Sequence, residues 1–194
     1  MTMQKLSKMR GDTLTEVMFA TAVAALCIVL AMTSMNRSLA QSQMAVETTL
    51  TRQSIEAQAD MLRYVRDEYM QNKTGTTGEP KIWRDIVGRS MPSASVFGTC
   101  YSETVDPPNG SFFVRFPNVN GADDMSRLEL VTDASAFEVP ETNADIGSGI
   151  WVEAVRGGAS SGVSYLDLHI RACWEPPYSG PEATLGTIVR LYYE

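Results

Sequence analysis

The chain has 194 residues, 44% of them hydrophobic, and a formal net charge of −7. This length is enough for one domain of modest size with its own core. Beyond Gly75, eight Lys and Arg residues stand against sixteen Asp and Glu residues, without a basic cluster. The balance disfavours nucleic-acid binding, which needs cations that neutralise phosphates, and it suits a soluble displayed surface.

The N-terminus joins a basic stretch to a long apolar span. The first ten residues contain Lys5, Lys8 and Arg10 and no acid, and residues 17–35 contain neither charge nor proline. As a helix that rises about 1.5 Å per residue, this span matches the ~30 Å hydrocarbon thickness of a bilayer. The cations predict a cytoplasmic N-terminus and an outward-facing remainder.

An acid, Glu16, immediately precedes this span. A carboxylate in a membrane segment costs a few kcal/mol of insertion energy, which predicts a function and a charged partner. The alternative is an ordinary signal anchor with an acid at its edge. A cleavable secretory signal is disfavoured, because residues 35–37 (Met-Asn-Arg) are not a small-residue cleavage site and residues 38–40 are a poor one.

The helical pattern continues beyond the span to about Lys73. From Asp12 there is no glycine before Gly75 and no proline before Pro80. Apolar residues recur at helical steps and predict an amphipathic helix with one side left to cover a sheet. These residues are Val46, Leu50, Ala57, Met61, Val65 and Tyr69.

The rest of the chain changes period. A short helical piece is predicted at 81–88, followed by strands separated by turn residues, with a surface loop at 133–149. We therefore predict an α+β fold, in which the C-terminal half of the helix packs on an antiparallel sheet of four to six strands. In the clearest strand, alternate residues Leu166, Leu168, Ile170 and Ala172 share one face. The predicted strands are 95–101, 111–116, 127–132, 150–155, 163–174 and 184–193.

The N-terminal features resemble the type IV pilin-like family of prepilins, minor pilins and pseudopilins. The resemblance covers about residues 5–70: a basic leader, Gly11, the Thr-Leu pair at 13–14, Glu16 and an uninterrupted apolar helix. It implies that a prepilin peptidase cleaves after Gly11, so that Asp12 becomes the first mature residue and Glu16 the fifth. Family members usually begin with an apolar residue, so N-methylation of Asp12 stays open.

The resemblance also implies a domain organisation: a leader at 1–11, a membrane or filament-core helix at 12–35, an amphipathic helix at 36–73 and a β-rich head at 74–194. The chain would be anchored in the membrane before assembly and lie in an extracellular pilus afterwards. Its partners would be other pilin subunits, the prepilin peptidase and an inner-membrane assembly platform.

Many major pilins of this family have a proline that kinks the long helix, and this chain has none there. Its absence, together with Asp12, favours a minor subunit over the major one. The sequence does not choose among pilus, competence and type II secretion assemblies. Glu16 argues against the tip pseudopilin type, which lacks that acid. The alternatives are a type II secretion pseudopilin of another kind, or a signal-anchored extracellular ligand-binding protein that does not assemble.

Cleavage would also create a physical partner for Glu16. The new α-amine at Asp12 of one subunit could pair with Glu16 of its neighbour, because both charges would otherwise be stranded among apolar side chains. Such a pair would select the axial register of the subunits more than it would add stability.

Cysteine use agrees with export. Cys27 lies in the apolar span and is interpreted as a small hydrophobe. Cys100 and Cys173 are the two cysteines of the head, and in an exported head they are predicted to form a disulfide. Metal ligation is disfavoured, because the sole histidine, His169, and two sulfurs do not complete a tetrahedral site.

No enzyme constellation is predicted, and no cofactor. His169 is a thin candidate for a catalytic base and is predicted to be structural, on the polar face of its strand. Asp123-Asp124 could begin a cation-binding loop, but the spacing of an EF-hand is absent, which favours a plain acidic turn. The C-terminal tyrosines 178, 192 and 193 are interpreted as edge-strand packing rather than an adhesive surface.

Overall fold

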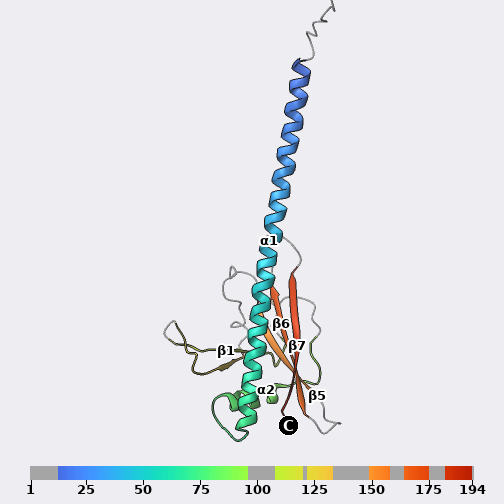
Figure 1. Cartoon of the computed structure of the whole chain (residues 1–194). Coiled ribbons are helices and arrows are strands. Elements are labelled where there is room, and N and C mark those ends of the chain that lie inside the picture. Colours follow the sequence, from blue (N-terminus) through green and yellow to red (C-terminus); the bar gives the residue numbers. More distant parts are fainter. Residues whose placement is uncertain are drawn as a thin grey trace, which may run out of the picture. The chain divides into compact units, whose positions relative to one another are not determined.

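The computed structural model describes residues 13–95, 108–119, 122–132, 149–157, 164–174 and 182–193. The chain divides into two compact units, Met1–Ala45 and Val46–Glu194. A long helix, α1 (Thr13–Gln71), belongs to both, and the second unit adds α2 (Glu79–Arg89) and the strands (Figure 1). A long apolar helix followed by an antiparallel sheet is the α+β class that the sequence predicts.

The second unit is built on one face of α1. Ile55, Ala59, Leu62 and Val65 are spaced by three or four residues and are all buried, so one side of α1 covers the sheet. The predicted apolar side is wrong in part, because Val46, Leu50 and Ala57 are exposed. After α1, the chain turns through Gly78, whose φ of 66° lies in the left-handed region that glycine adopts without strain. Helix α2 follows and buries Trp83 and Ile86 completely in the same core.

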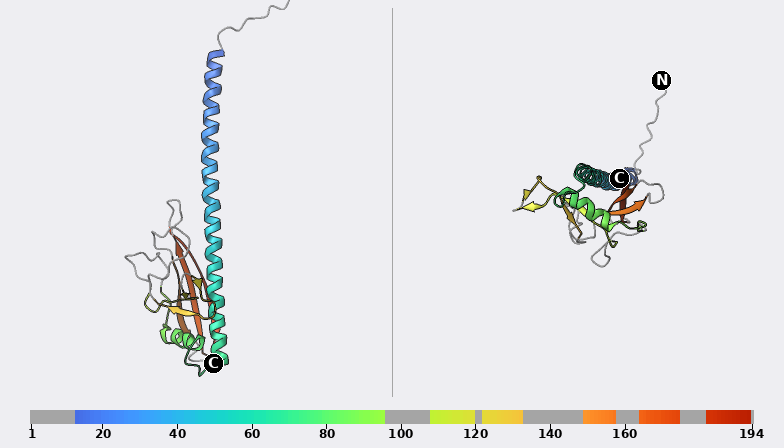
Figure 2. Two further views of the ribbon diagram at one scale, coloured as in Figure 1. Left: turned by 90° about the vertical axis from the view of Figure 1, so that its left-hand side faces the viewer. Right: turned by 90° about the horizontal axis from the view of Figure 1, so that it is seen from below.

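The main sheet consists of β5 (Gly149–Gly157), β6 (Tyr165–Trp174) and β7 (Ala183–Tyr192), antiparallel and in that order. It lies along the part of α1 that belongs to the second unit (Figure 2). The predicted alternation in β6 is confirmed, because its four apolar residues on one face are fully buried in the core shared with α1. Those residues are Leu166, Leu168, Ile170 and Ala172.

The prediction of one sheet with four to six strands is wrong for the described residues. The strands before β5 form two separate two-stranded ribbons, β1 with β4 and β2 with β3. A single bridge, Phe112 to Val152, joins this region to β5. Two residues further on, at Val114, the partner is a side chain of α1 and not a strand. The Gln58 amide accepts a hydrogen bond from the Val114 N–H and donates one to the Val114 carbonyl. The bounds are β1 Phe113–Arg115, β2 Asn118–Val119, β3 Ala122–Asp123 and β4 Glu129–Val131.

A buried ion pair lies on the other face of the main sheet. Glu153 of β5 is fully buried and its carboxylate lies 3.2 Å from the Arg171 guanidinium of β6. The same carboxylate accepts hydrogen bonds from the backbone N–H and the hydroxyl of Ser95, at 2.7 and 2.8 Å, and from the Trp151 indole. Arg171 also donates to the Ser95 hydroxyl and carbonyl. This cluster holds Ser95, which follows α2 in the chain, against the sheet.

The cysteine prediction is answered in part. Cys27 is a free, exposed thiol and Cys173 is disulfide-bonded. The sequence has one other cysteine, Cys100, which lies outside the described residues, as do residues 96–101 of one predicted strand and 133–148 of the predicted loop.

We expect both the Cys100→Ser and the Cys173→Ser variant to lose stability, and Cys173→Ser to lose at least as much, because Cys173 is buried and its replacement also buries a hydroxyl. A disulfide that closes so long a loop stabilises by roughly 4 kcal/mol in the chain-entropy model. The measurement is thermal unfolding of the full chain in detergent, with and without reductant. Cys27→Ser is the control and should unfold like the wild type. Identical unfolding of the wild type with and without reductant would refute the disulfide.

Candidate functional site

The first unit presents an apolar surface along α1. Every residue from 14 to 39 is exposed in the structure, including Leu14, Phe19 and Leu30, whose side chains are 59–73% accessible. Within the described residues, α1 is the one helix long and apolar enough to cross a membrane. By length and composition, this helix is compatible with a membrane anchor.

Two threonine hydroxyls in this part of α1 have hydrogen-bond partners within the helix itself. The Thr21 hydroxyl donates to the Met18 carbonyl and the Thr33 hydroxyl to the Leu30 carbonyl, both at 2.9 Å. Such bonds to the preceding turn leave these hydroxyls without need of water. The span can therefore be surrounded by lipid or by apolar helices without stranding these groups.

Glu16 is the acid in the first turn of α1, which begins at Thr13. The first N–H groups of a helix lack partners within the helix, and its dipole places positive potential there. An exposed carboxylate in the first turn thus sits where negative charge is favoured. The predicted cleavage residues Gly11 and Asp12 lie outside the described residues.

The polar face of β6 holds the predicted structural histidine. His169 lies opposite Glu153 of β5 and Ile188 of β7. Partial burial, with the positive charge of Arg171 as a second cause, lowers the pKa of His169 below its ordinary value. The imidazole is therefore neutral over a wider pH range than that of a free histidine.

Asp167, two residues before His169, is engaged elsewhere. Arg190 of β7 donates two hydrogen bonds to its carboxylate, each 2.7 Å long. These bonds lower the pKa of Asp167 below its usual range, and the guanidinium also lies 4.2 Å from the centre of the Tyr165 ring. The arrangement stabilises two adjacent strands.

The candidate acidic turn has its own hydrogen-bond partners. Asp124 accepts hydrogen bonds from the backbone N–H and the hydroxyl of Ser126, and Arg127 lies 3.4 Å away. The Ser126 bonds are the main cause of a lowered pKa at Asp124. In the part of the chain that the structure describes, no group of three or more His, Cys, Asp or Glu side chains could hold a metal.

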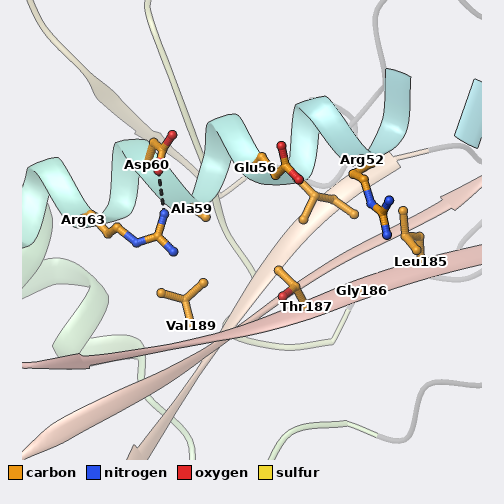
Figure 3. A pocket seen from close by; sticks show the side chains of 10 residues that line it. Arg52, Glu56, Ala59, Asp60, Arg63, Leu185, Gly186, Thr187 and Val189 are labelled. Atoms are coloured by element: carbon orange, nitrogen blue, oxygen red, sulfur yellow. Dashed lines mark hydrogen bonds and ion pairs between the residues drawn. The ribbon is translucent and has the colours of Figure 1, made fainter. Parts of the chain in front are cut away.

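A groove of about 520 Å³ lies between α1 and β7 (Figure 3). Leu185, Thr187 and Val189 point from β7 toward the helix, and charged side chains line the helix side. The charged residues are Arg52, Glu56, Asp60 and Arg63. In the sequence these charges stand between the apolar positions of the helix, and no local pattern indicates that β7 lies beside them.

Comparisons with protein-family models, with curated proteins and with solved structures find no match. The functional interpretation therefore rests on the residues themselves. Sequence reasoning also missed Glu153, although a charge inside the run Ile150-Trp151-Val152-Glu153-Ala154 is the kind of signal that marks a buried polar partner.

Proposed function

We propose that this protein is a structural subunit of a type IV pilus-like filament, with the minor pilins as the best-fitting type. The observation that carries the proposal is the stretch 17–35 of α1, which is apolar, uncharged and exposed throughout, with the acid Glu16 just before it in the first turn of the helix. An exposed surface of this size in water would be an aggregation hazard. Lipid covers it before assembly, and neighbouring helices cover it in a filament.

The proposed path has three stages. The chain enters the membrane with its basic N-terminus in the cytoplasm, following the positive charges at Lys5, Lys8 and Arg10. A prepilin peptidase then removes residues 1–11. Finally, the mature subunit leaves the bilayer for the filament, where helix packing over residues 17–35 replaces lipid contacts.

Glu16 sets the position of each subunit in this scheme. Its carboxylate pairs with the α-amine that cleavage creates at Asp12 of a neighbouring subunit. Both groups are surrounded by apolar side chains in the packed filament, so an unpaired register is costly. The displayed unit, Val46–Glu194, then forms the surface of the assembly and has no catalytic role.

A signal-anchored ligand-binding protein is the second candidate. The groove between α1 and β7 favours it, because a groove lined with charged and apolar residues is a binding surface that filament formation does not require. In that case α1 is only an anchor and Glu16 has no partner.

The two candidates are separated by where the protein is found. We expect it in filaments sheared from the cell surface, and we expect it to remain in the membrane of a strain without prepilin peptidase. An anchored binder would stay with the membrane in both strains. If a strain makes filaments and the protein is found only in its membrane, the proposal is contradicted.

A further inference from the structure

The outer edge of β7 is a long, unpaired strand edge. In the sheet order β5-β6-β7, β7 pairs with β6 alone among the described strands. Its register with β6 is continuous over ten residue pairs, so no bulge interrupts it. Native proteins usually protect such edges with proline, charged side chains or bulges. β7 has no proline and no bulge, and its one charged side chain, Arg190, is engaged with Asp167 of β6. An edge of this kind is a template for another strand.

The hydrogen bonds show which backbone groups of β7 face outward. Tyr193 donates its N–H to the Ser164 carbonyl directly opposite, so this is a hydrogen-bonded pair. Such pairs alternate with non-bonded ones along an antiparallel ladder. Thr184, Gly186, Ile188 and Arg190 are therefore in the non-bonded pairs with β6, and their N–H and carbonyl groups point away from the sheet.

The hydrogen bonds at β5, on the opposite edge of the sheet, independently give the same assignment of inward and outward backbone groups. On β5, Val152 exchanges both backbone hydrogen bonds with Phe112, and Ala154 accepts one from Met91, so these residues face away from β6. Their partners on β6, Ile170 and Leu168, consequently direct their backbone groups to β7. The edge of β5 is thus occupied, whereas the outer edge of β7 pairs with no other described strand. At its last residue, the carbonyl of Tyr192 accepts a hydrogen bond from Arg66 of α1, so the edge available to a further strand is the part before Tyr192.

The helix wall of the groove carries charges at a spacing that fits a strand. Arg52 and Glu56 are four residues apart on α1, which is about 6 Å along the helix. Every second residue of a strand is spaced by about 6.6 Å. Neither side chain has an ion-pair partner within the described residues, whereas Asp60 is paired with Arg63 (Figure 3). An added strand would therefore meet one cation and then one anion.

We propose that the groove between α1 and β7 binds an extended peptide segment of a partner protein, which adds to the β5-β6-β7 sheet as a fourth strand. The segment places an acidic side chain against Arg52 and, two residues along, a basic one against Glu56. Main-chain hydrogen bonds to Gly186 and Ile188 supply affinity, and the two charges supply selectivity. This surface lies within the second unit and does not depend on filament assembly.

The probe is a labelled nine-residue peptide of alternating threonine and valine, with one glutamate and one lysine two positions apart at its centre. Its binding to the full chain in detergent is measured by fluorescence anisotropy. Ile188→Pro removes an outward N–H without removing a hydrogen bond to β6, and proline is tolerated on edge strands although it also fixes the backbone φ. We expect it to weaken binding at least tenfold, whereas Ile188→Thr, which keeps the N–H, should bind within twofold of the wild type.

The charges are tested with the Arg52→Gln/Glu56→Gln variant. We expect three- to tenfold weaker binding of the charged peptide and unchanged binding of a peptide with glutamine at both charged positions. Failure of the wild type to bind, or equal binding by Ile188→Pro, would overturn the proposal. So would self-association of the wild type that Ile188→Pro abolishes without any peptide binding, because the edge would then take a second copy of this chain.

A peptide variant covers the case in which Ile188→Pro does not fold. Methylating alternate amide nitrogens of the peptide blocks hydrogen bonding along one of its edges only. Of the two alternately methylated peptides, one should bind like the unmodified probe and the other at least tenfold more weakly. Equal binding of the two would contradict strand addition.

Discussion

Replacing Glu16 with alanine is expected to abolish incorporation into filaments while leaving membrane insertion and leader removal intact. The variant leaves the α-amine of a neighbouring Asp12 without a counter-charge among apolar helices. Breaking a buried ion pair from one side costs about 3–5 kcal/mol, which corresponds to a hundredfold or greater loss of assembled subunit. The measurement is the ratio of the variant in sheared filaments to that in the membrane.

A matched control separates charge loss from a general effect on α1. Asp67→Ala removes an exposed acid from the same helix, far from the apolar span, and should assemble at wild-type levels. Glu16→Gln keeps the size of the side chain but not its charge and should fail like the alanine variant. Normal assembly of Glu16→Ala would show that this carboxylate does not pair with a neighbouring subunit.

The second large effect concerns the head. Glu153→Ala is expected to lower the free energy of unfolding by about 3–5 kcal/mol, because it leaves the buried Arg171 guanidinium without its counter-ion. Ser95 and Trp151 lose hydrogen-bond acceptors in the same step. Urea unfolding of the full chain in detergent, followed by tryptophan fluorescence, measures the loss.

The paired variant Glu153→Met/Arg171→Met tests whether the loss of stability comes from leaving Arg171 without its counter-ion. It removes both charges together, so only the hydrogen bonds of Ser95 and Trp151 remain unmade. We expect it to be more stable than Glu153→Ala by at least 1 kcal/mol, since apolar replacement of a whole buried pair is often close to neutral. If the single variant lost less than 1 kcal/mol, the cluster would not be what fastens Ser95 to the sheet.

The long elements could be predicted because their local signals agree with their tertiary environment. Without glycine or proline between Asp12 and Gly75, nothing stops α1, and it ends at Gln71. The strands β5, β6 and β7 lie within two residues of their predicted bounds. In β6, the period-two pattern of Leu166 to Ala172 coincides with a core on one face, so pattern and burial give the same answer.

The remainder depends on contacts between residues far apart in the sequence. Gln58 pairs with the backbone of Val114, 56 positions away. No local signal indicates that this side chain takes the place of a neighbouring strand at Val114. Glu153 similarly finds Ser95 and Arg171 on other segments. The groove exists because β7 comes to lie beside α1, a placement that propensity and periodicity do not encode.

The central claim is tested most directly by the mass of the N-terminal peptide, taken from cells with and without prepilin peptidase. We predict a mature protein that begins at Asp12 in the first strain and an uncleaved chain in the second. The same spectrum shows whether Asp12 carries a methyl group. A chain that keeps Met1 in both strains, or one cleaved after Ala40, would contradict the account and leave a membrane-anchored or secreted β-rich protein.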